Sequence, residues 1–123
     1  MDHRELAAEL FLSDCNCAQA VLEAFSDVTG LEKSFAAKLA SSFGGGMGRM
    51  REVCGAVSGM LMVAGLLYGY DDPGENDVNK KAHYQLVQNL AGQFREKIGS
   101  IICREILSNP PSDPNPTPRT AEF

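Results

Sequence analysis

The sequence contains no cluster of basic residues, and its charge balance is acidic. Its 123 residues include 11 Lys and Arg against 16 Asp and Glu, so the formal net charge is −5. Binding to nucleic acid requires basic patches that neutralise phosphate groups, and binding to an anionic membrane surface requires them too. The composition therefore argues against both kinds of partner. The length is that of one domain and is sufficient to bury a core without cross-links.

Long hydrophobic runs are also scarce. The N-terminal stretch MDHRELAAELF carries charges where a secretory signal has its apolar segment, so we expect a cytoplasmic protein. Residues 53–70 lack charge over 18 positions, which is the lower limit for a membrane span, but they include four glycines. We predict that this segment forms the central helix of a soluble bundle and is buried on all sides. Gly55 and Gly59, four residues apart, predict that another helix crosses it closely.

Alternating runs of β-branched residues, which would indicate strands, are absent as well. Apolar residues recur at helical spacing, and we predict an all-α, single-domain bundle of five to six helices. Ser13 or Asp14 is the expected N-cap of the second helix. The predicted helices cover residues 4–13, 15–25, 31–43, 49–68, 75–97 and 101–107, with 53–67 at the centre. We expect residues 1–108 to form this helical domain and the proline-rich residues 109–123 to form a flexible tail.

Only four cysteines are present, namely Cys15, Cys17, Cys54 and Cys103. Because thiols stay reduced in the cytoplasm, this set favours metal or redox chemistry over a disulfide scaffold. The spacing matches no common zinc pattern, and burial as small apolar side chains is the alternative. We place Cys15 and Cys17 at a helix start and Cys54 in the first or second turn of the central helix. Helix starts and nearby arginines both favour the thiolate form.

A glycine-rich segment, FGGGMGRMREVC, ends at the third cysteine. Its simplest role is to connect two helices, because glycine permits tight, left-handed turns. Glycine amides can also hold an anion beside the start of a helix. We therefore expect Gly44, Gly45 and Gly46, together with the charge of Arg49, to stabilise negative charge on sulfur, with Arg51 as the alternative source of that charge.

Three stretches, DCNCAQAVLEAF, FGGGMGRMREVCGAVSGMLMVAG and CREIL, resemble in this order the family described as "putative redox-active protein", which is named for its cysteine pattern C_GCAxxG_C_C. The resemblance covers nearly all of residues 15–107, and the four cysteines match one by one. Cys17 and Ala18 supply the CA of the GCA element, whereas Asn16 and Val21 stand where the pattern has its two glycines. The resemblance implies a redox role in which the four cysteines share one site.

We therefore expect a small redox or electron-carrying protein whose cysteines converge near one end of the central helix. If the site holds a metal centre, such as an iron–sulfur cluster or another metal ion, Cys15, Cys17, Cys54 and Cys103 are its expected ligands. If the site instead cycles between dithiol and disulfide, Cys17 and Cys54 are the expected exchanging pair. The redox partner is a protein or a small molecule of unspecified identity, and the chain is a candidate homo-oligomer.

A different class of function is the main alternative. The chain would then be a helical module for binding or oligomerisation, with inert, buried cysteines and no redox chemistry. A zinc ion of purely structural use is a third reading, which predicts loss of folding with a chelator. Reactive thiols distinguish the first class from the second.

Overall fold

Helices build the computed structural model of the chain, which describes residues 2–71, 77–108 and 110–114. No strand occurs in these ranges, so the all-α prediction is confirmed. An isolated antiparallel bridge joins Val53 and Ile102. The elements are α1 (His3–Leu12), α2 (Cys17–Ala24), α3 (Ser26–Thr29), α4 (Lys33–Ala40), the 3-10 helix η1 (Ser41–Phe43), α5 (Gly55–Tyr68), α6 (Asp77–Ile98) and α7 (Cys103–Ile106).

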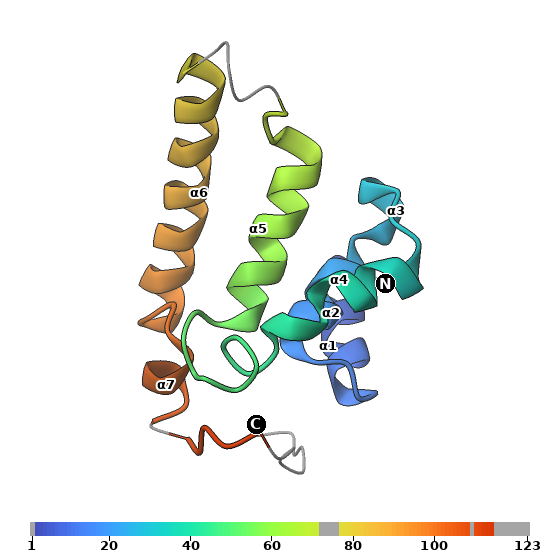
Figure 1. Cartoon of the computed structure of the whole chain (residues 1–123), viewed down its shortest axis with the longest axis vertical. Coiled ribbons are helices and arrows are strands. Elements are labelled where there is room, and N and C mark those ends of the chain that lie inside the picture. Colours follow the sequence, from blue (N-terminus) through green and yellow to red (C-terminus); the bar gives the residue numbers. More distant parts are fainter. Residues whose placement is uncertain (1, 72–76, 109, 115–123) are drawn as a thin grey trace.

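Figure 1 shows how these elements are arranged around α5. α5 and α6 stand side by side as a long hairpin, and α1 to α4 cluster against the other flank of α5, toward its N-terminal half. α7 lies below the C-terminal end of α6, close to the loop that precedes α5 (Figure 1). The starts of α5 and α7 therefore come together at one end of the molecule.

The core lies where α2, α4 and α5 meet. Its buried side chains are Ala18, Leu22, Ala36, Ala40 and Val63, and partly buried Phe25, Leu31, Phe43 and Met62 pack around them. Small side chains of this kind let helix axes approach closely. A Cβ added at Gly59 would lie 2.9 Å from the Ala18 carbonyl oxygen, so α2 crosses α5 at the glycine pair that predicted a close crossing.

The central helix begins later than predicted. The expected start was near Arg49, but α5 starts at Gly55 with Cys54 as its N-cap, so Cys54 precedes the first turn. The physical reason is the backbone of the preceding loop, where Arg49 and Arg51 have φ angles of +64° and +62°. Left-handed residues cannot extend a right-handed helix.

The predicted burial of this helix on all sides is wrong, because only five of its 14 residues are buried. Val57 and Val63 are buried, whereas Leu66, Leu67 and Tyr68 are 46%, 40% and 69% exposed. The cluster of α1 to α4 does not reach this far along α5 (Figure 1). Within the described ranges, no helix combines the length and the apolar character that a membrane crossing requires.

The second helix also starts later than predicted. Its N-cap is Asn16 instead of Ser13 or Asp14. The Asn16 side chain accepts a hydrogen bond from the Gln19 amide (2.8 Å), and the Gln19 side chain accepts one from the Asn16 amide (3.0 Å). This reciprocal capping box fixes Cys17 as the first helical residue.

Other boundaries differ by a few residues. The helix predicted over 31–43 starts at Lys33 and ends as 3-10 turn η1, and the helix predicted over 101–107 is limited to Cys103–Ile106. The helix predicted over 75–97 is α6, although residues 75 and 76 lie outside the described residues. Most of the predicted tail, residues 109 and 115–123, lies outside them too.

Candidate functional site

The loop before α5 is built from left-handed residues. Five consecutive residues, from Gly45 to Arg49, have φ angles between +58° and +71°, and Met47 and Arg49 are not glycines. The carbonyl oxygens of Gly44 and Gly45 accept hydrogen bonds from the Arg49 and Arg51 amides (3.1 and 3.2 Å). A left-handed conformation costs a non-glycine residue roughly 1–2 kcal/mol. The loop therefore holds a strained backbone in place with its own hydrogen bonds.

A short extended pairing then brings two cysteines together. The Cys54 amide donates to the Ile101 carbonyl (2.7 Å), and the Cys103 amide donates to the Glu52 carbonyl (2.6 Å). Outside this pairing, Arg104 Nη1 lies 3.1 Å from Glu52 Oε1. Because of these contacts, the N-cap of α5 and the first residue of α7 lie next to each other although 49 positions separate Cys54 and Cys103.

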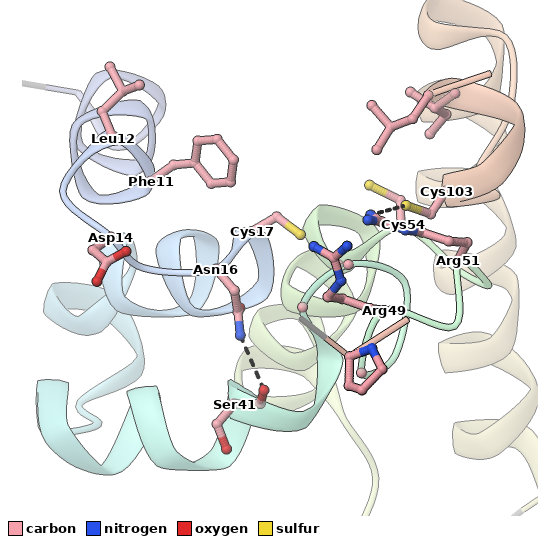
Figure 2. A pocket seen from close by; sticks show the side chains of 17 residues that line it. Phe11, Leu12, Asp14, Asn16, Cys17, Ser41, Arg49, Arg51, Cys54 and Cys103 are labelled. Atoms are coloured by element: carbon pink, nitrogen blue, oxygen red, sulfur yellow. Dashed lines mark hydrogen bonds between the residues drawn. The ribbon is translucent and has the colours of Figure 1, made fainter. Parts of the chain in front are cut away.

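Cys17 approaches from α2 on the opposite side. A Cβ added at Gly55 would collide with Cys17 Sγ and would lie 2.8 Å from the Phe43 carbonyl oxygen. The sulfur of Cys17 is therefore packed against the backbone at the start of α5. In Figure 2, Cys17 points in from one side, while Cys54 and Cys103 lie on the other side beside Arg51.

These three cysteines line one cavity with a volume of about 620 Å³. Two arginines and three glycines of the preceding loop contribute to its wall. The lining residues are Phe11, Leu12, Asp14, Asn16, Cys17, Ser41, Gly44, Gly45, Gly48, Arg49, Arg51, Cys54, Gly55, Cys103, Ile106, Leu107 and Pro114. Three thiols thus share one open site with positive charge and apolar walls.

The fourth cysteine faces elsewhere. Cys15 is not among the residues that line the cavity, and its thiol donates to Glu23 Oε2 at 3.4 Å. Cys15 precedes the N-cap Asn16, and the backbone before it turns at Asp14, where φ is +90°. The structure therefore brings together Cys17, Cys54 and Cys103 and leaves Cys15 beside Glu23.

The surroundings of Cys54 disfavour its thiolate. Burial raises the pKa of the Cys54 thiol above the ordinary value, while the backbone amides of Ala56 and Val57 at the start of α5 act in the opposite direction. Negative charge on Cys17 or Cys103 would raise the pKa of Cys54 further. At Cys54 the loss of solvation therefore outweighs the start of the helix, so the expectation that a helix start favours the thiolate does not hold for this residue.

Arg51 is the most unusual polar residue of the site. Its side chain is only 2% exposed. Nε donates to the Pro111 carbonyl (2.9 Å), Nη1 lies 3.7 Å from Cys103 Sγ, and Nη2 is buried without a hydrogen-bond partner. Arg49, the arginine preferred from the sequence, also lines the cavity, and its Nε donates to the Asp113 carbonyl (2.7 Å).

The three predicted glycines occupy two kinds of position. Gly44 and Gly45 line the cavity, whereas Gly46 is buried behind it, where an added Cβ would lie 2.7 Å from the Cβ of Cys103. In the backbone hydrogen bonds of these three glycines, the glycine carbonyl oxygens are the acceptors. Their expected role as amide donors to an anion therefore stays a prediction.

The donor set does not match a metal-ion site in this arrangement. Among the described residues, no group of three or more His, Cys, Asp or Glu side chains is placed so that it could hold a metal ion. The thiol of Cys15 is directed to Glu23 instead of the cavity. Ligation of a metal by all four cysteines would require Cys15 to change its position.

Sequence reasoning did not identify the apolar wall of the cavity. Phe11 and Leu12 come from the end of α1, and Ile106 and Leu107 come from the end of α7 and its C-cap. At the sequence level these residues look like ordinary core positions. No local signal in the sequence indicates that the ends of α1 and α7 face the same cavity.

Comparison with known proteins identifies a family that is named for its cysteine pattern. The family model described as "Putative redox-active protein (C_GCAxxG_C_C)" matches residues 15–122. No curated protein and no solved structure matches the chain significantly. Of the two departures from the pattern, Asn16 forms the capping box of α2 and Val21 packs against Gly59 of α5. The chain belongs to this C_GCAxxG_C_C family.

Proposed function

We propose that this protein carries out thiol–disulfide exchange with the three cysteines that line the cavity. The observation that carries the proposal is that Cys17, Cys54 and Cys103 share one cavity, in a chain whose family is described as redox-active. Three of the four cysteines are partly exposed, and only Cys103 is buried. Thiols that a partner can reach suit exchange chemistry better than the alternative of an inert helical module with buried cysteines.

The exchange would proceed in two displacements. A cavity thiolate attacks one sulfur of a disulfide in the redox partner, which forms a mixed disulfide and releases a partner thiolate. A second cavity thiolate attacks the protein sulfur of the mixed disulfide, which closes a protein disulfide and releases the other partner thiolate. Two electrons pass to the partner, and the two protons from the cysteines go to its thiolates or to solvent.

Cys54 lies between two candidate partners in this scheme. The pair predicted from the sequence is Cys17 and Cys54. The pairing of the segments around Val53 and Ile102 adds Cys54 and Cys103 as a second combination. Both combinations place Cys54 at the centre of the exchange, and both leave Cys15 out.

Disulfide mapping tests this proposal. The reduced full chain is treated with an excess of a small disulfide, its remaining thiols are blocked, and its peptides are identified by mass spectrometry. We expect a Cys54 disulfide with Cys17 or Cys103 in the wild type and in Cys15→Ser, and no intramolecular disulfide in Cys54→Ser. Four unmodified thiols after treatment, or a disulfide that requires Cys15, would contradict the proposal.

Electron transfer through a bound cluster is the other form of redox chemistry predicted for the four cysteines. Iron and sulfide analysis of protein purified without oxygen checks it separately. Near-stoichiometric iron and sulfide would replace the exchange scheme with a cluster held by the cysteines.

A further inference from the structure

Arg51 carries a charge that the described part of the chain does not neutralise. The side chain is 2% exposed, and no carboxylate of the described residues forms an ion pair with it. Its acceptors are a carbonyl oxygen of Pro111 and the sulfur of Cys103, while Nη2 has none. A buried ion without a counter-charge is costly to maintain, so such a group is expected to meet an anion when the protein functions.

The backbone fixes this guanidinium at the wall of the cavity. The Arg51 amide donates to the Gly45 carbonyl (3.2 Å), and the Arg51 carbonyl accepts from the amide and the Nη1 of Arg104 (3.1 and 3.2 Å). The residue has a φ angle of +62°, which a non-glycine residue rarely adopts. Strain that is retained at such a position commonly serves a function.

The charges that face the cavity are mostly positive. Arg49 and Arg51 line it, and Asp14 is the acidic side chain among the lining residues. Glu52, which is adjacent in sequence, pairs with Arg104 outside the cavity. The chain as a whole has a net charge of −5, so this region opposes the field of the rest of the protein.

We propose that the cavity selects an anionic substrate, a small disulfide whose substituents carry carboxylate groups, and that Arg51 supplies the positive charge that attracts it. This inference rests on the proposed thiol–disulfide exchange and names its substrate class. A carboxylate of the substrate provides the missing counter-charge while a cavity thiolate attacks its disulfide. The products are a mixed disulfide with the protein and one carboxylate-bearing thiolate, which leaves with the electron pair of the broken S–S bond.

Two chromogenic disulfides of different charge test the proposal. At pH 7, 5,5′-dithiobis(2-nitrobenzoic acid) is a dianion, and 4,4′-dithiodipyridine is neutral. The second-order rate constants are measured with full-chain Cys15→Ser, in which every thiol lines the cavity. The ratio of the two constants, anionic over neutral, is divided by the same ratio for 2-mercaptoethanol, which removes the intrinsic reactivity of each probe. We expect this normalised ratio to exceed one in spite of the negative net charge.

Variants of Arg51 in the Cys15→Ser protein show whether Arg51 causes the preference for the anionic probe. Arg51→Gln should lower the normalised ratio about tenfold, as loss of one nearby charge in a partly desolvated site predicts. Arg51→Lys should retain most of it. Arg95→Gln, which removes an exposed charge of α6 away from the cavity, should leave it unchanged. The ratio compares two probes on the same protein, so a general change in thiol reactivity cancels. The measurement on Cys15→Ser itself needs no Arg51 variant, so the test remains valid even if one variant misfolds.

Two results would overturn the substrate assignment while the exchange chemistry stands. One is a normalised ratio of one or less in the parent. The other is that Arg51→Gln slows both probes by the same factor, which would mean that Arg51 serves only the sulfur of Cys103. Failure of both probes to react with the folded chain would contradict the proposed function itself, and the substrate assignment with it.

Discussion

At the scale of single residues, the environment of Cys54 decides how the site responds to pH. The thiol lies at the N-cap of α5, partly buried, and it is close enough to Cys17 and Cys103 for their charges to affect it. Burial favours the neutral thiol more strongly than the amides of α5 favour the thiolate. A thiol of this kind ionises at higher pH than the same group in an unfolded chain.

We predict that Cys54 is alkylated by iodoacetamide with a pH midpoint above the ordinary cysteine value of about 8.5. Because only the thiolate reacts, a raised pKa shifts the whole rate profile toward alkaline pH. Peptide-resolved mass spectrometry of the wild-type chain between about pH 7 and pH 11 measures the profile. A midpoint at or below that of N-acetylcysteine would contradict the account of this residue.

The same shift affects stability with a definite sign. The folded chain holds the Cys54 proton to higher pH than the unfolded chain, so the unfolded state binds fewer protons above about pH 8.5. The free energy of unfolding should therefore decrease as the pH rises from there through the folded pKa. In Cys54→Ser this decrease should be smaller, as urea denaturation at a series of pH values can show.

The two cysteines of the CNC motif show what residue-level reasoning could predict. Helical geometry turns positions two apart in nearly opposite directions, so both thiols can face one site only if Cys15 lies outside the helix. Cys15 does lie outside α2, yet its thiol is directed to Glu23. The left-handed Asp14 belongs to the end of α1, where the Asp14 and Cys15 amides donate to the Phe11 and Leu10 carbonyls. The Glu23 carboxylate lies eight residues beyond Cys15, and the spacing of the two cysteines does not reveal this contact.

At the scale of elements, α5 contains one glycine at a tightly packed position and another at an open one. An added Cβ at Gly59 would lie 2.9 Å from both the Ala18 carbonyl oxygen and Val21 Cβ, whereas one at Gly65 would meet nothing within 4 Å. The first glycine permits the contact with α2. The second is an exposed helical position where glycine has no packing partner.

Alanine substitution separates these two roles within one helix. We predict that Gly59→Ala destabilises the protein by about 1–3 kcal/mol, because the added methyl group forces α2 and α5 apart. Gly65→Ala should stabilise it by about 0.5–1 kcal/mol through helix propensity alone. Urea denaturation of both variants provides the comparison, and equal effects of the two substitutions would refute this view of the α2–α5 contact.

The loop before α5 offers a second matched pair. Gly46 and Gly48 have φ angles of +71° and +58°, so alanine is strained at both. Only Gly46 is crowded, since an added Cβ there would lie 2.7 Å from Cys103 Cβ, whereas at Gly48 the nearest atom is 3.9 Å away. A methyl group at Gly48 would therefore face open space, whereas one at Gly46 would press against Cys103.

We predict that Gly48→Ala costs about 1 kcal/mol from backbone strain alone. Gly46→Ala should cost more, by roughly another 1–3 kcal/mol from overpacking, and should change the reaction rate of Cys103. Denaturation and peptide-resolved thiol labelling measure the two effects. If both variants retained wild-type labelling at Cys103, Gly46 would have no part in positioning that thiol.

Element boundaries were predictable where they depend on local signals. Apolar periodicity identified α1, α4 and α6 to within a few residues, whereas the short helix α3 was not predicted. The stretch 49–54 was predicted to be helical because its composition suits a helix. Its real conformation depends on pairing with residues 101–104, which lie about fifty positions away. A pattern within the sequence cannot reveal a pairing at that distance.

At the scale of the whole molecule, burial is unevenly distributed. Five of the eight residues of α2 are buried, whereas no side chain of residues 78–98 in α6 is buried. α6 packs beside α5 in the hairpin of Figure 1. Elements with few buried contacts open at lower free energy than the core.

We therefore predict that the backbone amides of α6 exchange with deuterium faster than those of α2. Hydrogen–deuterium exchange at low micromolar protein concentration, followed by mass spectrometry, gives the rates for peptides of both helices. Equal protection of α6 and α2 at every dilution would contradict the prediction. Protection of α6 that appears only at high concentration would instead support the expected homo-oligomer, formed through this hairpin.

The cysteine site illustrates how the global fold adds to the sequence. The family resemblance predicted four cysteines in one site, and the match over residues 15–122 shows that the chain belongs to the C_GCAxxG_C_C family. The fold gathers Cys17, Cys54 and Cys103 around one cavity. It adds the buried Arg51, which the sequence offered only as an alternative to Arg49. Burial of a guanidinium is a property of the assembled loop and tail, and no spacing rule predicts it.

A redox titration shows whether the cavity cysteines form a reversible dithiol–disulfide couple. The full chain is equilibrated without oxygen in glutathione buffers of graded ratio, and its free thiols are then counted. We expect two of the four thiols to disappear in a single two-electron transition, which Cys15→Ser retains and Cys54→Ser abolishes. Four free thiols at every ratio would contradict this expectation and would leave the cysteines as structural residues.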